Sequence, residues 1–214
     1  MTFDRKALTK RMVEIDYRHK HRHLPGSLSA LPIIMSIYSD FDEANDVFIL
    51  SKGHSCAALY AVLEAMGKKP NVALVHPERD PENGVTITSG SLGHGLPIAV
   101  GIAYAKKLRG EAGKVYVLLG DGECAEGTTW ESLLIAERLD LKQNLFVYVD
   151  NNGWQGSDRT LYPTMGRLGA IFPVIHCATR KGDGIRMFEA APEKSVHLVT
   201  ESDFNGIMEE LSAL

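Results

Sequence analysis

The sequence lacks the features of a membrane protein, a nucleic-acid binder or a secreted protein. No apolar run is long enough to span a bilayer, and the residues after Met1 do not resemble a signal peptide. The net charge is −4 with acids and bases interspersed, whereas a nucleic-acid binder usually has a concentrated basic face. Three cysteines without a Cys-x-x-Cys pair argue against a zinc site or redox pair. We therefore expect a cytoplasmic protein.

Internal repeats, low-complexity segments and Gly/Ser-rich or Pro-rich linkers are also absent. The chain has 214 residues, of which 44% are hydrophobic, and this is enough to bury a sizeable core. We therefore expect residues 1–214 to form a single domain. The basic cluster at 18–23 is interpreted as a solvated helix end.

Strand and helix patterns alternate along the chain. Short apolar runs predict buried strands at 46–50, 114–119, 144–149 and 174–179. Helical spacing predicts helices at 4–20, 28–38, 55–66, 95–109 and 127–139, and a capping-box-like sequence at 200–203 opens a last one. Loops are expected at 23–27 and 68–93. This order predicts an α/β fold, with a mostly parallel sheet covered by helices on both faces.

Polar turns follow two of the predicted strands. Gly120-Asp121-Gly122 ends one, and Asn151-Asn152 ends the next. Ligands of parallel sheets bind beyond the carboxyl ends of the strands, so both turns are expected at one edge. Glycines allow backbone amides to approach an anion, and a divalent cation would offset the repulsion between a carboxylate and a diphosphate. The two turns therefore predict a site for a metal ion and a diphosphate.

Gly-Asp-Gly followed by Asn152 resembles the thiamine diphosphate motif. Five segments together resemble the transketolase family and span most of the chain. They are GDGECAEG at 120–127 with Trp130-Glu131, SKGH at 51–54 with Leu59-Tyr60, TSGSLGHG at 88–95, HLPGS at 23–27, and RKGDG at 180–184. The resemblance implies a thiamine-diphosphate-binding fold with Mg²⁺ as the companion ion.

The resemblance also implies roles for individual residues. Asp121, Asn152 and the main-chain carbonyl of Trp154 would be the metal ligands. The cofactor-binding residues would be His54, Leu92, Gly93, Gly120, Asp121, Gly122, Glu123 and Asn152. Catalytic roles fall to His54, to His23 and His76 facing a substrate channel, and to Glu126, which would link two active sites across a dimer interface.

Two parts of the family pattern are missing from this chain. No stretch after residue 184 could form the second domain, which binds the aminopyrimidine ring. We therefore expect a second subunit with the pyrimidine-binding and C-terminal domains, in an α2β2 assembly. The segment between Gly153 and Val174 is shorter than in the family, so one peripheral β–α unit is expected to be absent.

The leading hypothesis is a transketolase subunit that transfers a two-carbon ketol unit between sugar phosphates. A pyruvate-using enzyme resembling deoxyxylulose-phosphate synthase shares most of these motifs and is a second hypothesis. A non-catalytic assembly or regulatory subunit is a third, motivated by the shortened chain. The sequence leaves open the donor, the acceptor, and the choice of Mg²⁺ over Ca²⁺ or Mn²⁺.

Overall fold

The computed structural model describes residues 2–160, 165–193 and 198–213, and its centre is a four-stranded sheet. All neighbouring strands pair in parallel. Their order is β1 (Val47–Leu50), β2 (Val115–Gly120), β3 (Leu145–Asn151) and β6 (Val174–Ala178). Each strand lies within two residues of its predicted bounds. A separate antiparallel hairpin follows β3 and consists of β4 (Trp154–Gln155) and β5 (Asp158–Arg159).

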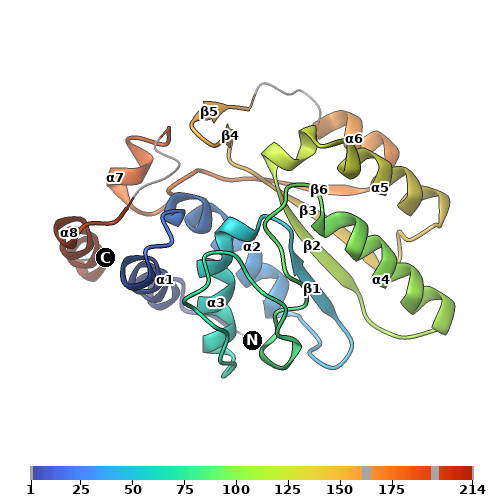
Figure 1. The fold of residues 1–214 in the computed structure, drawn as a ribbon, viewed down its shortest axis with the longest axis horizontal. Helices are drawn as coiled ribbons and strands as arrows, with labels where there is room; N and C mark the ends of the chain where they lie inside the picture. The colour runs from blue at the N-terminus through green and yellow to red at the C-terminus, as the bar shows by residue number, and fades with distance from the viewer. Residues whose placement is uncertain (1, 161–164, 194–197, 214) are drawn as a thin grey trace.

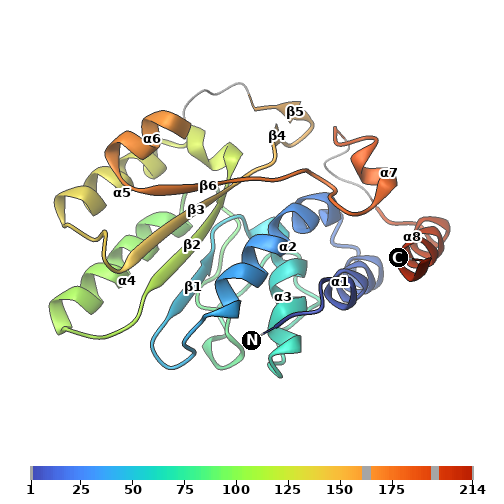
Figure 2. The same cartoon turned by 180° about the vertical axis from the view of Figure 1, so that it is seen from behind.

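Helices cover both faces of the sheet (Figures 1 and 2). One face carries α1 (Arg5–His19), α2 (Leu24–Ser39) and α3 (Cys56–Ala65). The other carries α4 (Gly95–Arg109), α5 (Gly127–Arg138) and α6 (Met165–Ile171). Two C-terminal helices, α7 (Arg186–Glu189) and α8 (Glu201–Ala213), follow, and α8 packs against α1. The predicted mostly parallel α/β fold is confirmed.

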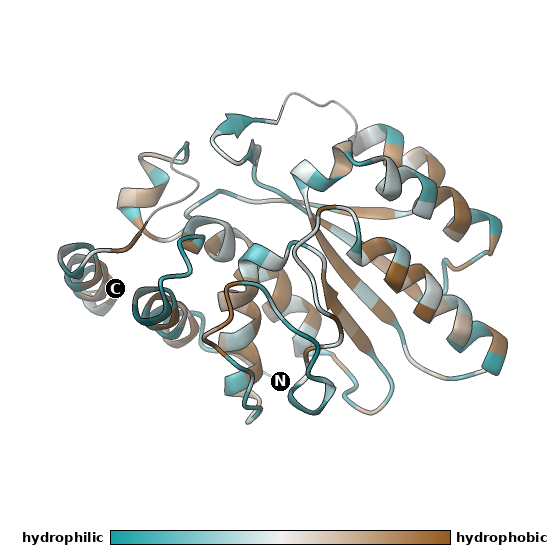
Figure 3. Ribbon diagram, in the orientation of Figure 1, coloured by the Kyte–Doolittle hydropathy of each residue, from teal (hydrophilic) through white to brown (hydrophobic). Residues whose placement is uncertain are grey.

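Strand β2 connects the two hydrophobic cores. All six of its residues are buried, and alternate side chains enter opposite cores. Tyr116 and Leu118 pack with α2 and α3, whereas Val115, Val117 and Leu119 pack with α4 and α5. Figure 3 shows this pattern as hydrophobic strands between helices whose hydrophobic faces point inward. A near-continuous apolar sequence is therefore required at β2 because neither of its faces meets water.

The start of α2 differs from the prediction. The helix begins at Leu24 rather than at residue 28, so the predicted loop at 23–27 is wrong. Pro25 lies in the first turn, where its missing N–H has no helical partner to lose and its fixed φ suits the helix. His23 consequently stands immediately before the helix.

The basic cluster at 18–23 is only partly a solvated helix end. Arg18, His19 and Lys20 are exposed, as is Arg22, but His21 is 3% exposed. Its Nε2 lies 2.8 Å from the carbonyl oxygen of Val72, and burial lowers the pKa of His21 to about 4. The solvated interpretation is therefore wrong for His21, because this side chain packs inward against the loop after α3.

Two further expectations concern the C-terminal helix and the membrane. The capping box that opens α8 is present, with the Thr200 amide donating to Asp203 Oδ2 and the Asp203 amide donating to Thr200 Oγ1. Among the helices of the described ranges, none is both long and apolar enough to cross a membrane.

Candidate active site

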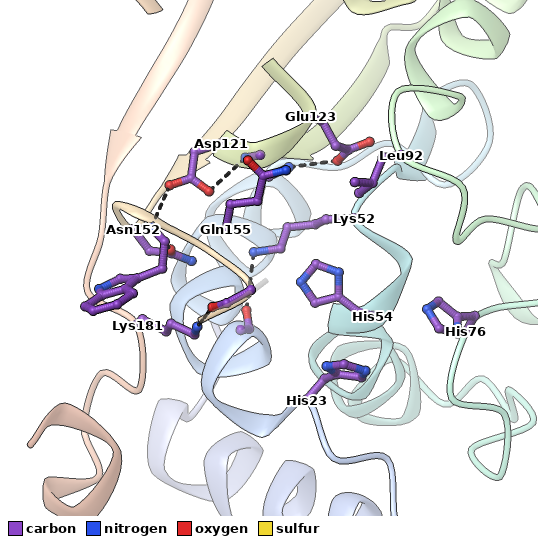
Figure 4. A pocket seen from close by; sticks show the side chains of 15 residues that line it. His23, Lys52, His54, His76, Leu92, Asp121, Glu123, Asn152, Gln155 and Lys181 are labelled. Atoms are coloured by element: carbon purple, nitrogen blue, oxygen red, sulfur yellow. Dashed lines mark hydrogen bonds between the residues drawn. The ribbon is translucent and has the colours of Figure 1, made fainter. Parts of the chain in front are cut away.

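A cavity of about 290 Å³ lies at the carboxyl edge of the sheet. Its walls come from the ends of β2 and β3, the short helix Gly53–Ser55, the start of α2 and the loop at Lys181 (Figure 4). Segments far apart in sequence therefore meet here, as predicted for the ends of parallel strands.

Asp121 and Asn152 meet around the backbone of the hairpin that follows β3. Asp121 Oδ2 accepts hydrogen bonds from the amides of Gly153 at 2.8 Å and Trp154 at 3.1 Å, and from the Thr160 hydroxyl at 3.1 Å. Asn152 Oδ1 lies 3.1 Å from the same Trp154 amide. Asp121 Oδ2 and Asn152 Oδ1 thus lie close together although they follow different strands. Two oxygens must meet in this way before they can bind one metal ion.

The electrostatics at Asp121 suit a cation. Burial raises the pKa of this carboxyl, and the charge of Lys52 partly opposes the rise. No group of three or more His, Cys, Asp or Glu that could hold a metal occurs in the described parts of the chain. A cation here would therefore take carboxylate, amide and carbonyl oxygens together with oxygens of a ligand. Mg²⁺ prefers oxygen ligands and is commonly shared with phosphate, so the donor set fits.

Gly122 forms a close approach point beside Asp121. A Cβ added at this position would lie 2.9 Å from the Gln155 Cγ, so a larger residue would clash with Gln155. The Gly122 amide already lies 3.0 Å from Asp121 Oδ1. Gly122 also lines the cavity, and the absence of a side chain lets its backbone approach an anion there, which fits the diphosphate site predicted from the glycines.

Lys52 and Asp150 form a fully buried ion pair below the cavity, with side-chain exposures of 1% and 0%. Asp150 also accepts from the Ser29 hydroxyl at 2.7 Å and from the Thr179 hydroxyl. Ser29 in turn accepts from Asn152 Nδ2 at 3.1 Å. The pair therefore supports the orientation of Asn152 through one hydroxyl, and it places a cation in the cavity wall.

Three histidines line the opposite side of the cavity. The ring of His23 lies 5.5 Å from that of His54 and 6.3 Å from that of His76, measured between centroids. Burial is the main cause that holds the pKa of His54 well below its ordinary value, and the nearby Lys52 charge lowers it further. His54 is therefore neutral near pH 7 and can both donate and accept hydrogen bonds.

Glu123 joins three separate segments. Its carboxylate accepts from the Ser51 hydroxyl at 2.5 Å, the Gly93 amide at 2.9 Å and the Gly120 amide at 2.8 Å. Burial raises the pKa of Glu123, and these hydrogen bonds oppose the rise. Although Glu123 lines the cavity, its carboxylate is engaged within the protein and braces the surrounding loops.

The remaining predicted residues lie at or beside the cavity. Leu92 lines it and is 38% exposed. Gly93 is buried with φ of 75°, a conformation that favours glycine, and an added Cβ would lie 2.8 Å from the Glu126 Cβ. Glu126 itself is half-buried and stands next to this loop outside the cavity lining. Gly120 lines the cavity at the end of β2.

Lys181 is a cavity residue that the sequence did not assign. Its Nζ donates to the Gly156 carbonyl at 2.7 Å and lies 5.6 Å from the centre of the Trp154 ring. Burial lowers the pKa of Lys181 to about 8. Lys52 was missed as well. Both stand inside recognised segments, at 51–54 and 180–184, but nothing in a sequence tells which lysines fold inward.

The fold and the cavity together offer, at the ends of parallel strands, the oxygen donors and glycine backbone that a diphosphate and a metal ion would require. Residues 39–159 match the family described as "Transketolase, thiamine diphosphate binding domain". The chain therefore belongs to the transketolase family. This confirms the resemblance predicted from the five motifs.

Relatives and solved structures agree with this assignment. The chain is 37% identical to an apulose-4-phosphate transketolase subunit of Actinobacillus succinogenes, covering 80% of each chain. It is 35% identical to the protein of the same name in Phocaeicola vulgatus, covering 71% of this chain but only 60% of the relative. A transketolase of Leishmania mexicana superimposes with a TM-score of 0.84 at 20% identity, covering 97% of this chain and 40% of that one. The likeness to this structure confirms the fold.

Proposed function

We propose that the protein is one subunit of a thiamine-diphosphate-dependent transketolase that transfers a two-carbon ketol unit between sugar phosphates. The main support is one cavity in which Asp121 and Asn152 stand on one side and His23, His54 and His76 on the other. The relatives that are themselves named as transketolase subunits support the division of the enzyme between two chains.

In this proposal the polar side of the cavity holds the cofactor. Asp121, Asn152 and the carbonyl of Trp154 would hold Mg²⁺ together with the diphosphate. The backbone of Gly122 would lie against the diphosphate, and Lys52, held by Asp150, would stand in the wall beside it. When bound, thiamine diphosphate supplies the carbanion chemistry of the transfer.

The histidine side of the cavity contacts the sugar. Imidazoles near neutral pH exchange hydrogen bonds and protons with hydroxyl groups, which a ketol donor and an aldose acceptor both present. His54 is suited to the hydrogen bonding, because burial lowers its pKa and keeps the ring neutral. His23 and His76 face the substrate channel, and substrate identity depends on what the partner adds.

The second subunit carries the pyrimidine-binding and C-terminal domains, in an α2β2 assembly with the cofactor at the interface. Glu126 lies beside Gly93, which follows the exposed Leu92 of the cavity lining, and the partner chain is expected to approach here. The three free cysteines fit a cytoplasmic location for the complex.

The test mixes the purified chain with its candidate second subunit, thiamine diphosphate, Mg²⁺, xylulose 5-phosphate, pyruvate and aldose acceptors, and identifies the products by mass spectrometry. We expect a sugar phosphate extended by two carbons from the ketose. Asp121→Ala is expected to abolish the product, whereas the exposed Glu131→Gln serves as the matched control.

Other outcomes favour the other hypotheses. Added carbons that derive from pyruvate, with release of carbon dioxide, would assign the chain to the decarboxylating enzymes. Activity that survives Asp121→Ala in the assembled complex would contradict the proposal and favour a non-catalytic role.

A further inference from the structure

Asp16 is a buried carboxylate in the last turns of α1, beneath the connection that leads to the cavity. Its exposure is 1%. Neither carboxylate oxygen has a well-aligned hydrogen-bond partner among the described residues. Burying an ionisable group without an ion pair costs free energy, so some interaction of this carboxyl with the surrounding backbone must offset that cost.

The connection above Asp16 is short and conformationally unusual. Residues 20–23 join α1 to α2, and two of them have positive φ, 56° at Lys20 and 68° at Arg22. Residues other than glycine rarely adopt this left-handed backbone conformation, because their Cβ crowds the neighbouring carbonyl. Such a turn persists only where the surrounding structure holds it.

Asp16 faces the backbone of this whole connection. Its main-chain oxygen accepts from the amides of Lys20 and His21. The next three amides, those of Arg22, His23 and Leu24, lie near its carboxylate and lower its pKa, while burial has the larger effect and raises it to about 7. The backbone of residues 20–24 therefore surrounds Asp16, with two amides bonded to its main-chain oxygen and three beside its carboxylate.

This arrangement replaces an ordinary helix cap. Serine, threonine, aspartate or asparagine usually occupies the N-cap, but the N-cap of α2 is His23. The carboxylate of Asp16, from the preceding helix, lies at the positive end of α2 instead. His23 belongs to the backbone beside Asp16, and its ring lies 5.5 Å from that of His54.

We propose that Asp16 is a positioning residue for His23: it holds the connection at 20–24 in the conformation that turns the His23 imidazole into the substrate side of the cavity. The geometric part concerns the chain alone. The catalytic consequence rests on the proposed transketolase function.

The first experiment measures the ring signals of the histidines by NMR in the full chain at one pH, with His23 assigned through His23→Gln. Asp16→Leu is expected to shift and broaden the His23 signal, and Asp16→Asn, which keeps an oxygen acceptor, to restore it in part. The control is Asp4→Leu, which removes the side-chain cap of α1, where Asp4 Oδ1 accepts from the Ala7 amide at 3.1 Å. An unshifted His23 signal in folded Asp16→Leu would overturn the proposal, and Asp16→Asn decides it if the leucine variant does not fold.

The second experiment uses the assembled enzyme. Asp16→Leu is expected to lower kcat about 10- to 100-fold while leaving the affinity for thiamine diphosphate unchanged, because misplacing one contact group affects the reacting geometry. In a His23→Gln background the same change should cause no further loss, and additive losses would contradict positioning through His23. If the unmodified complex transfers no ketol unit, the proposed function fails, and the NMR result still decides the role of Asp16.

Discussion

Replacing Lys52 with methionine should destabilise the chain more than any surface charge change. Methionine preserves most of the side-chain length but leaves Asp150 buried at 0% exposure without its cation. Breaking a buried pair in this way costs about 3–5 kcal/mol, because an uncompensated charge remains in the interior. The hydroxyls of Ser29 and Thr179 still donate to Asp150, so we expect the lower half of that range.

The measurement is thermal and urea unfolding of the chain without cofactor. For a chain of 214 residues, each kcal/mol corresponds to about 2–4 °C, so Tm should fall by roughly 6 to 16 °C. The matched control is Lys142→Met, which breaks an exposed pair with Glu137 at 2.8 Å and should change stability by about 1 kcal/mol or less.

A double variant separates the lone charge from lost packing. Adding Asp150→Asn to Lys52→Met removes both charges and should recover most of the lost stability, since no lone charge is left inside. If Lys52→Met alone costs no more than Lys142→Met, the buried pair is not what holds Asp150, and the reasoning is refuted.

Three further predictions concern the cofactor site and pH. Gly122→Ala should weaken thiamine diphosphate binding at least about tenfold by calorimetry, since its Cβ fills the approach point, while the control Gly101→Ala, with open space around it, should not. Asp121→Asn should leave the metal-free chain at least as stable, because burial disfavours the charge, and should abolish the rise in Tm on adding Mg²⁺. His21 has a pKa of about 4 in the folded chain against 6.5 in the unfolded one. The free energy of unfolding should therefore be constant above pH 6.5 and fall by about 3 kcal/mol between pH 6.5 and 4, because only the unfolded chain takes up the proton. In urea titrations, His21→Phe should lack this part of the decrease.

The sequence predicted the elements whose signals are local. Residues 95–109 form α4 at the predicted bounds, since Gly110 ends the helix in the left-handed conformation at φ of 64°. The strands were found because β2 and β3 are buried enough to require apolar runs. The start of α2 was missed because a proline suits both a loop and a first helical turn.

The residues of the candidate site that belong to recognised motifs could be predicted, whereas the buried ion pair beside them could not. The segments with His23, His54, Asp121 and Asn152 were expected at one cavity, and all four residues line it. The ion pair between Lys52 and Asp150 was not predicted, because the two residues are 98 positions apart and either side chain could have been exposed to solvent. Burial of a charge is settled by tertiary packing, which a single sequence does not display.

The carboxylate of Glu123 couples the stability of three segments around the cavity. Ser51, Gly93 and Gly120 lie far apart in sequence, yet all three donate to this one group. Loosening any one of them leaves the charge less satisfied and weakens its hold on the other two. Substitutions in the three segments should therefore be strongly non-additive: the first would cost the most, and later ones would remove little that remains. Natural variation here is expected to occur in groups of positions, with whole loops kept or lost together.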